Sequence, residues 1–101
     1  LWTMQDTILI VDDENSVRQT VREWLTAAQL DCEILAAADA EAALTIANEH
    51  PIDLAILDWN LGAGDDGLQL LQDLAAFHPD IIAIMITGFA NLATPLDAMR
   101  M

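Results

Sequence analysis

Acidic and hydroxyl side chains stand directly after three short apolar runs of the sequence. The run ILIV leads into Asp12, Asp13 and Glu14, the run LAIL leads into Asp58, and the run IIAIMI leads into Thr87. Carboxylates bind hard divalent cations through their oxygens and can also act as nucleophiles. These residue types in this repeated position indicate a site for a divalent cation and a phosphate, provided that the fold brings them together.

The apolar runs have the composition of buried β-strands. Residues 8–11, 54–57 and 81–86 show no polar alternation and are rich in branched side chains, which is typical of strands buried on both faces of a parallel sheet. The segment CEILAA, at residues 32–37, is a weaker candidate for another strand. The sequence thus predicts a parallel sheet in which the run ILIV is the central strand.

The segments between these runs have the spacing of amphipathic helices. Ser16 and Gln19 fit a capping box, and Asp39 is placed to cap an alanine-rich helix that runs to Ala47. Alternating strands and helices with right-handed crossovers give an α/β doubly wound parallel sheet. Apolar residues share one helical face in two segments: Val17, Val21, Trp24, Leu25 and Ala28 in the first, and Leu70, Leu71, Leu74 and Phe77 in the second.

Two histidine-proline pairs mark the ends of predicted helices. His50 and His78 each precede a proline and then a strand. Proline stops a helix, and a histidine in the last turn suits the negative end of the helix dipole. We therefore interpret both histidines as structural residues rather than as ligands or bases.

In a parallel sheet the carboxyl ends of all strands lie at the same side, so a doubly wound sheet brings the predicted site residues together there. Ligands of such sheets bind at these carboxyl ends. We expect Asp12, Asp13, Asp58 and Thr87 to converge. Carboxylates at such short distances raise one another's pKa unless a cation neutralises their charge. Mg²⁺ is the usual cation where oxygen ligands and a phosphate meet. The alternative is that the acids after the first strand only cap the following helix, a role that we expect for Glu14.

Composition limits the classes of partner. The 101 residues fit one domain, and the formal net charge of −14 makes nucleic acid and membrane surfaces poor direct partners. Cys32 is the only cysteine, so an intrachain disulfide is impossible, which fits a reducing compartment. The start of the chain lacks the pattern of a signal peptide. We expect a cytoplasmic protein, with residues 1–7 as a leader or an added remnant.

The segments ILIVDDENSVRQTVREWL, LAILDWNL and IIAIMITGFA resemble the receiver domain of two-component response regulators, from Ile8 to the end of the chain. The resemblance implies a flavodoxin-like fold and a phosphoacceptor for a histidine kinase or phosphotransfer protein, rather than an enzyme that acts on other substrates. It implies that Asp58 accepts the phosphoryl group and that Thr87 is the switch hydroxyl. It also implies a site for Mg²⁺ or Mn²⁺ made by Asp12, Asp13, Asp58 and the backbone carbonyl of Asn60.

The sequence departs from the receiver pattern at its end. Receivers continue into a fifth strand with a lysine and then a final helix, whereas this chain ends at Met101 and contains no lysine. We therefore expect residues 8–101 to form an incomplete receiver domain that lacks the last strand and helix. That would leave residues 81–86 as an apolar sheet edge, which favours a homodimer or a strand-exchanged assembly.

Two loops also differ from the pattern. The loop WNLGAGDDG after the phosphoacceptor lacks the usual proline and has one residue more, so Asp65 or Asp66 could also approach the metal. The favoured alternative is that both are solvated acids of the loop. Pro95 is expected in the first turn of the last predicted helix, with Thr94 as its N-cap. The backbone N–H groups of Trp59 and Gly88 are candidate donors to the phosphoryl group.

The same residues bear on three other functions. A phosphohydrolase with an aspartyl nucleophile needs a second aspartate two residues later, and neither Asp58 nor Asp12 has one. An EF-hand is excluded because Ala63 and Gln69 hold the places of the turn glycine and the bidentate glutamate. A pseudo-receiver, which keeps the fold as an interaction module without phosphorylation, remains as an alternative. The last stretch resembles receivers attached to transcription regulators.

Overall fold

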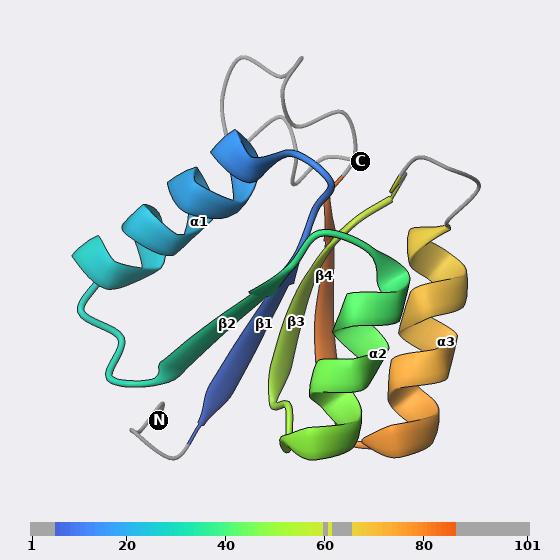
Figure 1. Ribbon diagram of the computed structural model, residues 1–101. Coiled ribbons are helices and arrows are strands. Elements are labelled where there is room, and N and C mark those ends of the chain that lie inside the picture. The colour runs from blue at the N-terminus through green and yellow to red at the C-terminus, as the bar shows by residue number, and fades with distance from the viewer. Residues whose placement is uncertain (1–5, 60, 62–65, 87–101) are drawn as a thin grey trace.

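The computed structural model describes residues 6–59, 61 and 66–86, in which strands and helices alternate along the chain (Figure 1). This alternation confirms the predicted α/β class. The elements are β1 (Thr7–Val11), α1 (Asn15–Ala27), β2 (Glu33–Ala37), α2 (Ala40–Glu49), β3 (Leu54–Asp58), α3 (Gly67–Phe77) and β4 (Ile82–Ile86).

The strands form one parallel sheet in the order β2-β1-β3-β4. Because the chain adds β2 on one side of β1 and then β3 and β4 on the other, the strand order reverses between β1 and β3. Helix α1 covers one face of the sheet, and α2 and α3 cover the opposite face (Figure 1). The fold is therefore the predicted doubly wound sheet, with its switch point at the ends of β1 and β3.

Two apolar clusters, one on each face, hold the sheet in place. Successive side chains of a strand point to opposite faces, so Leu9 packs with α2 and α3 while Ile8 and Ile10 pack with Val17 and Val21 of α1. All four side chains of the run ILIV are at most 1% exposed. The prediction of burial on both faces is confirmed for β1 and β3, whose carboxyl ends are thereby fixed firmly in space.

The same prediction is wrong for β4. Ile82 and Ile84 are 59% and 48% exposed. Their side chains lie on the same face of the sheet as α1, which covers that face at β1. Helix α1 packs mainly on β1, and among the residues that the structure describes no helix lies over this face of β4. An apolar run indicates that a strand can be buried, but whether a helix reaches it depends on the tertiary arrangement.

Helix boundaries confirm one predicted cap and correct another. The Oδ1 atom of Asp39 accepts a hydrogen bond from the backbone N–H of Ala42 at 2.8 Å, as expected for the N-cap of α2. The predicted capping box of Ser16 and Gln19 is wrong because α1 already begins at Asn15. Glu14 occupies the N-cap position but its side chain makes no capping hydrogen bond.

Not every residue of the predicted helical faces is buried. Trp24 and Phe77 are 45% and 47% exposed, and Ala28 is exposed just beyond the end of α1. Only a narrow stripe of each helix, such as Val17 and Val21 on α1, contacts the sheet. Residues at the margin of a stripe satisfy the helical spacing without being buried.

The histidines lie at helix ends. His78 is at the C-cap of α3, and its Nε2 atom lies 2.9 Å from the carbonyl oxygen of Ala47, which ties α3 to α2. This contact confirms the structural reading of His78. His50 is at the C-cap of α2 and donates its backbone N–H to the carbonyl of Ile46.

Thr94 and Pro95, predicted to begin a further helix, lie outside the described residues. Among the described helices, none combines the length and the apolar composition that a membrane span requires.

Candidate functional site

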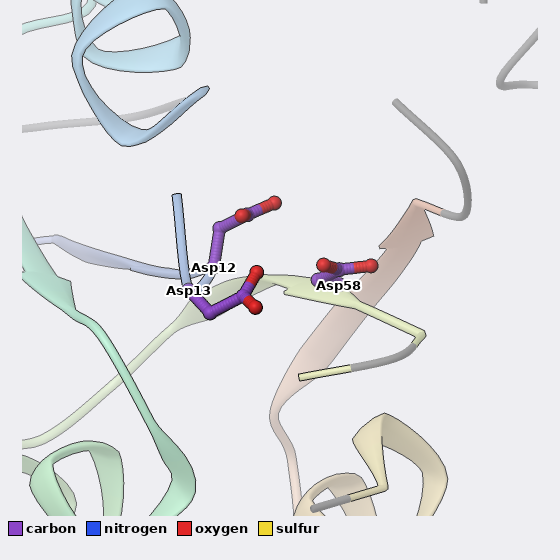
Figure 2. Close-up of side chains that lie close together, drawn as sticks. All are labelled: Asp12, Asp13 and Asp58. Atoms are coloured by element: carbon purple, nitrogen blue, oxygen red, sulfur yellow. The ribbon is translucent and has the colours of Figure 1, made fainter. Parts of the chain in front are cut away.

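Three carboxylates gather where β1 and β3 end. Val11 pairs with Leu57 across these neighbouring strands, so the residues that follow, Asp12 and Asp58, also lie at the same level of the sheet. Asp12, Asp13 and Asp58 each offer one carboxylate oxygen, and these oxygens all lie within 4.8 Å of one another (Figure 2). The convergence of these three predicted site residues is therefore observed.

Asp12 is the buried member of this cluster, with only 4% of its surface exposed. Its pKa is raised to about 6, chiefly by burial and to a smaller extent by the negative charges of Asp58, Asp13 and Glu14. A hydrogen bond from the backbone N–H of Glu14 to Asp12 Oδ1, 2.9 Å long, acts in the opposite direction. A cation at this point would remove the main cost of ionising Asp12, because it would offset both the lost hydration and the like charges.

The donor set fits a hard divalent cation. Asp58 is half-buried and Asp13 is exposed, so the cluster runs from the sheet interior to the surface. Three carboxylate oxygens so close together match the ligand type that Mg²⁺ prefers, and the open side leaves room for waters and a phosphate oxygen. The residues are therefore suitable ligands for Mg²⁺.

The chain around Asp58 is fixed by contacts from neighbouring elements. The backbone N–H of Trp59 donates to the carbonyl of Ile86 at 2.6 Å, and the carbonyl of Trp59 accepts from the N–H of Gly67 at 2.9 Å. The first bond corrects the expectation that the Trp59 N–H is available to a phosphoryl group, since the sheet ladder already uses it.

Gly67 is a site residue that sequence reasoning missed. A Cβ atom at this position would collide with the carbonyl oxygen of Asp58 and would lie 3.0 Å from both Trp59 Cα and Met85 Cε. The first turn of α3 thus packs directly on the main chain of Asp58. The only signal in the sequence was a glycine at the predicted start of a helix.

The other predicted site residues have different outcomes. Glu14 does not cap α1 through its side chain; instead its backbone N–H is bound by Asp12. Asp66 is the N-cap of α3, where its Oδ1 atom accepts from the N–H of Leu68 at 2.8 Å, and it is not part of the carboxylate cluster. The remaining predicted residues lie outside the described ranges: Asn60, Asp65, Thr87 and Gly88.

Comparison with known proteins agrees with this fold and shows the family. The sequence model described as "Response regulator receiver domain" matches residues 8–101. The chain is 36% identical over 99 residues to the nitrogen assimilation regulatory protein NtrX of Azorhizobium caulinodans, covering 96% of this chain and 21% of that protein. It is 33% identical over 92 residues to the response regulator protein PilR of Pseudomonas aeruginosa, covering 91% of this chain and 20% of that protein.

A solved structure is similar as well. A response regulator protein from Burkholderia pseudomallei, crystallised with a phosphorylated aspartic acid, a calcium ion and citrate, superposes with a TM-score of 0.74 at 26% identity, covering 94% of this chain and 54% of that one. The chain spans about a fifth of the length of the two curated relatives above. With a family match that spans nearly all of its residues, the chain belongs to the response regulator receiver domains.

Proposed function

We propose that this domain accepts a phosphoryl group on Asp58 from a sensor histidine kinase or a phosphotransfer protein, in a reaction that requires Mg²⁺. The observation that carries the proposal is the group of three carboxylate oxygens within 4.8 Å at the carboxyl ends of β1 and β3, in a chain of this family. The phosphorylated aspartic acid and calcium ion of the Burkholderia pseudomallei protein support the same chemistry here.

The transfer would be a direct displacement at phosphorus. An oxygen of the Asp58 carboxylate forms a bond to phosphorus while the bond from phosphorus to the donor imidazole nitrogen breaks. The electron pair of the broken bond stays on the imidazole, which takes up a proton from solvent. A carboxylate is a modest nucleophile, so the rate depends on positioning and on charge neutralisation.

The protein's own groups would supply that positioning. We assign Asp12, Asp13, Asp58 and the carbonyl of Asn60 as the ligands of Mg²⁺, which when bound neutralises charge on the phosphoryl oxygens. We assign Thr87 as the hydroxyl that responds to phosphorylation. The domain would act on itself alone, catalysing its own phosphorylation and dephosphorylation, and would not be an enzyme for other substrates.

The output is expected to lie in a larger protein. Since the chain spans about a fifth of its relatives, we propose that it is the regulatory module of a longer cytoplasmic regulator, most simply one that controls transcription. The lone half-buried Cys32 is consistent with a reducing compartment.

A phosphodonor assay tests the proposal. The chain is incubated with Mg²⁺ and acetyl phosphate, and its intact mass is measured. We expect the increment of one phosphoryl group, absent with a chelator and absent in Asp58→Asn. Asp80→Asn is the matched control and should leave the increment unchanged. Asp80 is exposed in the loop before β4, at the amino ends of the strands and so on the side of the sheet opposite the site. No increment in the wild-type chain under conditions where Mg²⁺ binds would favour the pseudo-receiver instead.

One observation favours a second role, self-association. Among the described residues, β4 is hydrogen-bonded to β3 on one side only, and Ile82 and Ile84 are largely exposed beside that open edge. Unpaired apolar edges pair readily with other chains. We propose that the 101-residue chain forms a homodimer through β4. A mass equal to the monomer in light scattering at working concentration would contradict this proposal.

A further inference from the structure

The guanidinium of Arg18 reaches back from α1 to the turn that carries the acids. Its Nη1 atom donates to the backbone carbonyl of Asp12 at 2.7 Å, and its Nη2 atom donates to Asn15 Oδ1 at 3.2 Å. Arg18 is half-buried, and its planar group can hold both acceptors at once in a fixed geometry. This contact joins a cationic side chain to the main chain of a proposed metal ligand.

The same turn is held at several other points. The backbone N–H of Asp12 donates to the carbonyl of Ala37 in β2, and one oxygen of its carboxylate accepts from the N–H of Glu14. The N–H of Arg18 in turn donates to the carbonyl of Glu14. Arg18 completes this set by binding the carbonyl oxygen of the peptide that joins Asp12 to Asp13.

We propose that Arg18 is a positioning residue for the cation site, which it serves by fixing the main chain of Asp12 so that the Asp12 and Asp13 carboxylates face Asp58. The proposal rests on the proposed function, because it concerns the same Mg²⁺ site. It assigns no contact between Arg18 and the cation.

Positioning and charge make opposite predictions for this residue. Arg18 carries a positive charge beside a cation site, so its charge alone opposes metal binding, and removing it would strengthen binding. If Arg18 positions the ligands, removing it weakens binding. Residues that orient metal ligands in this way typically change metal affinity by about 10-fold to 100-fold when they are lost.

The test is Mg²⁺ affinity measured by isothermal titration calorimetry on the whole chain. Arg18→Met should weaken Mg²⁺ binding by about tenfold. Arg18→Lys keeps the charge but not the two-pronged geometry, so it should weaken binding as well. Arg22→Met is the matched control: Arg22 lies one turn later on α1, donates to the carbonyl of Ile34 at 3.2 Å, and loses the same charge on substitution.

Thermal unfolding separates positioning from a purely structural role. A structural role lowers the melting temperature of Arg18→Met without metal but leaves the increase on adding Mg²⁺ as large as in wild type. Positioning reduces that increase, since stabilisation by a ligand follows its affinity for the folded state. If Arg18→Met does not fold, Asn15→Ala removes the second acceptor at an exposed position and should weaken binding by a smaller factor.

The outcomes are distinct. Equal Mg²⁺ affinity in Arg18→Met and Arg22→Met, or tighter binding in Arg18→Met, overturns the role of Arg18 while leaving the proposed function intact. Absence of Mg²⁺ binding in the wild-type chain overturns both. Weaker binding in Arg18→Met and Arg18→Lys, with Arg22→Met unchanged, supports the proposal.

Discussion

At the scale of single residues, the buried carboxyl of Asp12 is the group whose chemistry depends most on its surroundings. Burial raises its pKa to about 6, whereas a carboxyl of this type in an unfolded chain titrates near 3.8. Ionisation of Asp12 at neutral pH therefore costs free energy in the metal-free fold. The cost is tolerable in a site that binds a cation, because the cation binds the ionised form.

Asp12→Asn should make the metal-free protein more stable at pH 7. A raised folded-state pKa means that the contribution of Asp12 to stability is complete below about pH 4 and is lost as the pH rises through about 6. Asparagine keeps the oxygen that accepts from the N–H of Glu14. Because asparagine does not ionise, its contribution to stability does not fall as the pH rises. We expect a gain of about 1–2 kcal/mol in the free energy of unfolding at pH 7, discounted from the full shift because the cluster opens to solvent.

Urea denaturation at pH 7 and pH 4, in a buffer with chelator, measures this difference. Most of the gain should disappear at pH 4, where Asp12 of the wild-type chain is protonated in the folded state and close to half protonated in the unfolded state. Equal free energies of unfolding of the two proteins at pH 7 would show that ionisation of Asp12 does not destabilise the folded chain.

Mg²⁺ affinity should fall in acid for the same reason. Below about pH 6 a proton competes with the cation for Asp12, so the apparent affinity should drop about tenfold for each further pH unit as long as one proton is displaced. Calorimetric titrations between pH 5 and pH 8 should show a plateau above about pH 7. A constant affinity down to pH 5 would indicate that Asp12 is not a ligand.

At the scale of elements, the first turn of α3 is tightly fitted to the end of β3. Gly67 leaves space for the carbonyl of Asp58, and its own N–H binds the carbonyl of Trp59. The proposed phosphoacceptor is thus held between its strand and a helix start.

Gly67→Ala should destabilise the protein by about 1–3 kcal/mol, the usual cost of overpacking. The sign is diagnostic, because a glycine-to-alanine change within an unstrained helix normally stabilises it. Chemical denaturation measures the effect, and the same variant should bind Mg²⁺ more weakly because the main chain of Asp58 must shift. A gain in stability would mean that the close contact at Gly67 is relieved at little cost.

The sequence predicted correctly those features that follow directly from the residue type, such as the burial of an apolar strand. Every side chain of the run ILIV is apolar and buried, so both β1 and the acids that follow it could be placed. It failed for the exposed face of β4, because a run of apolar residues does not show which helix covers it. It also missed Arg18 and Gly67, whose partners are backbone carbonyls that only the folded chain brings near.

At the scale of the whole molecule, charge and apolar surface act in opposite directions. A net charge of −14 makes two copies of the chain repel each other, whereas the exposed side chains of Ile82 and Ile84 favour pairing of β4 edges. The balance between them should depend on salt, because screening weakens the repulsion and leaves apolar contact intact.

Ile84→Lys should therefore shift the chain toward the monomer. The substitution places a charge on β4, which among the described residues pairs with β3 alone, and a charge there disfavours pairing with a further strand. Sedimentation or light scattering at low and high salt should show a wild-type dimer that grows in population with salt and an Ile84→Lys chain that stays monomeric. Leu68→Lys is the control, since Leu68 is also exposed, at 41%, but lies on α3.

We propose Asp58 as the residue that receives the phosphoryl group. The direct measurement is to phosphorylate the chain with acetyl phosphate and Mg²⁺, reduce the acyl phosphate with borohydride, and locate the reduced residue by peptide mass mapping. We expect reduction at position 58, dependent on Mg²⁺, with Asp12 and Asp13 unchanged. Reduction at another acidic residue, or none at all in a chain that binds Mg²⁺, would rule out this role for Asp58.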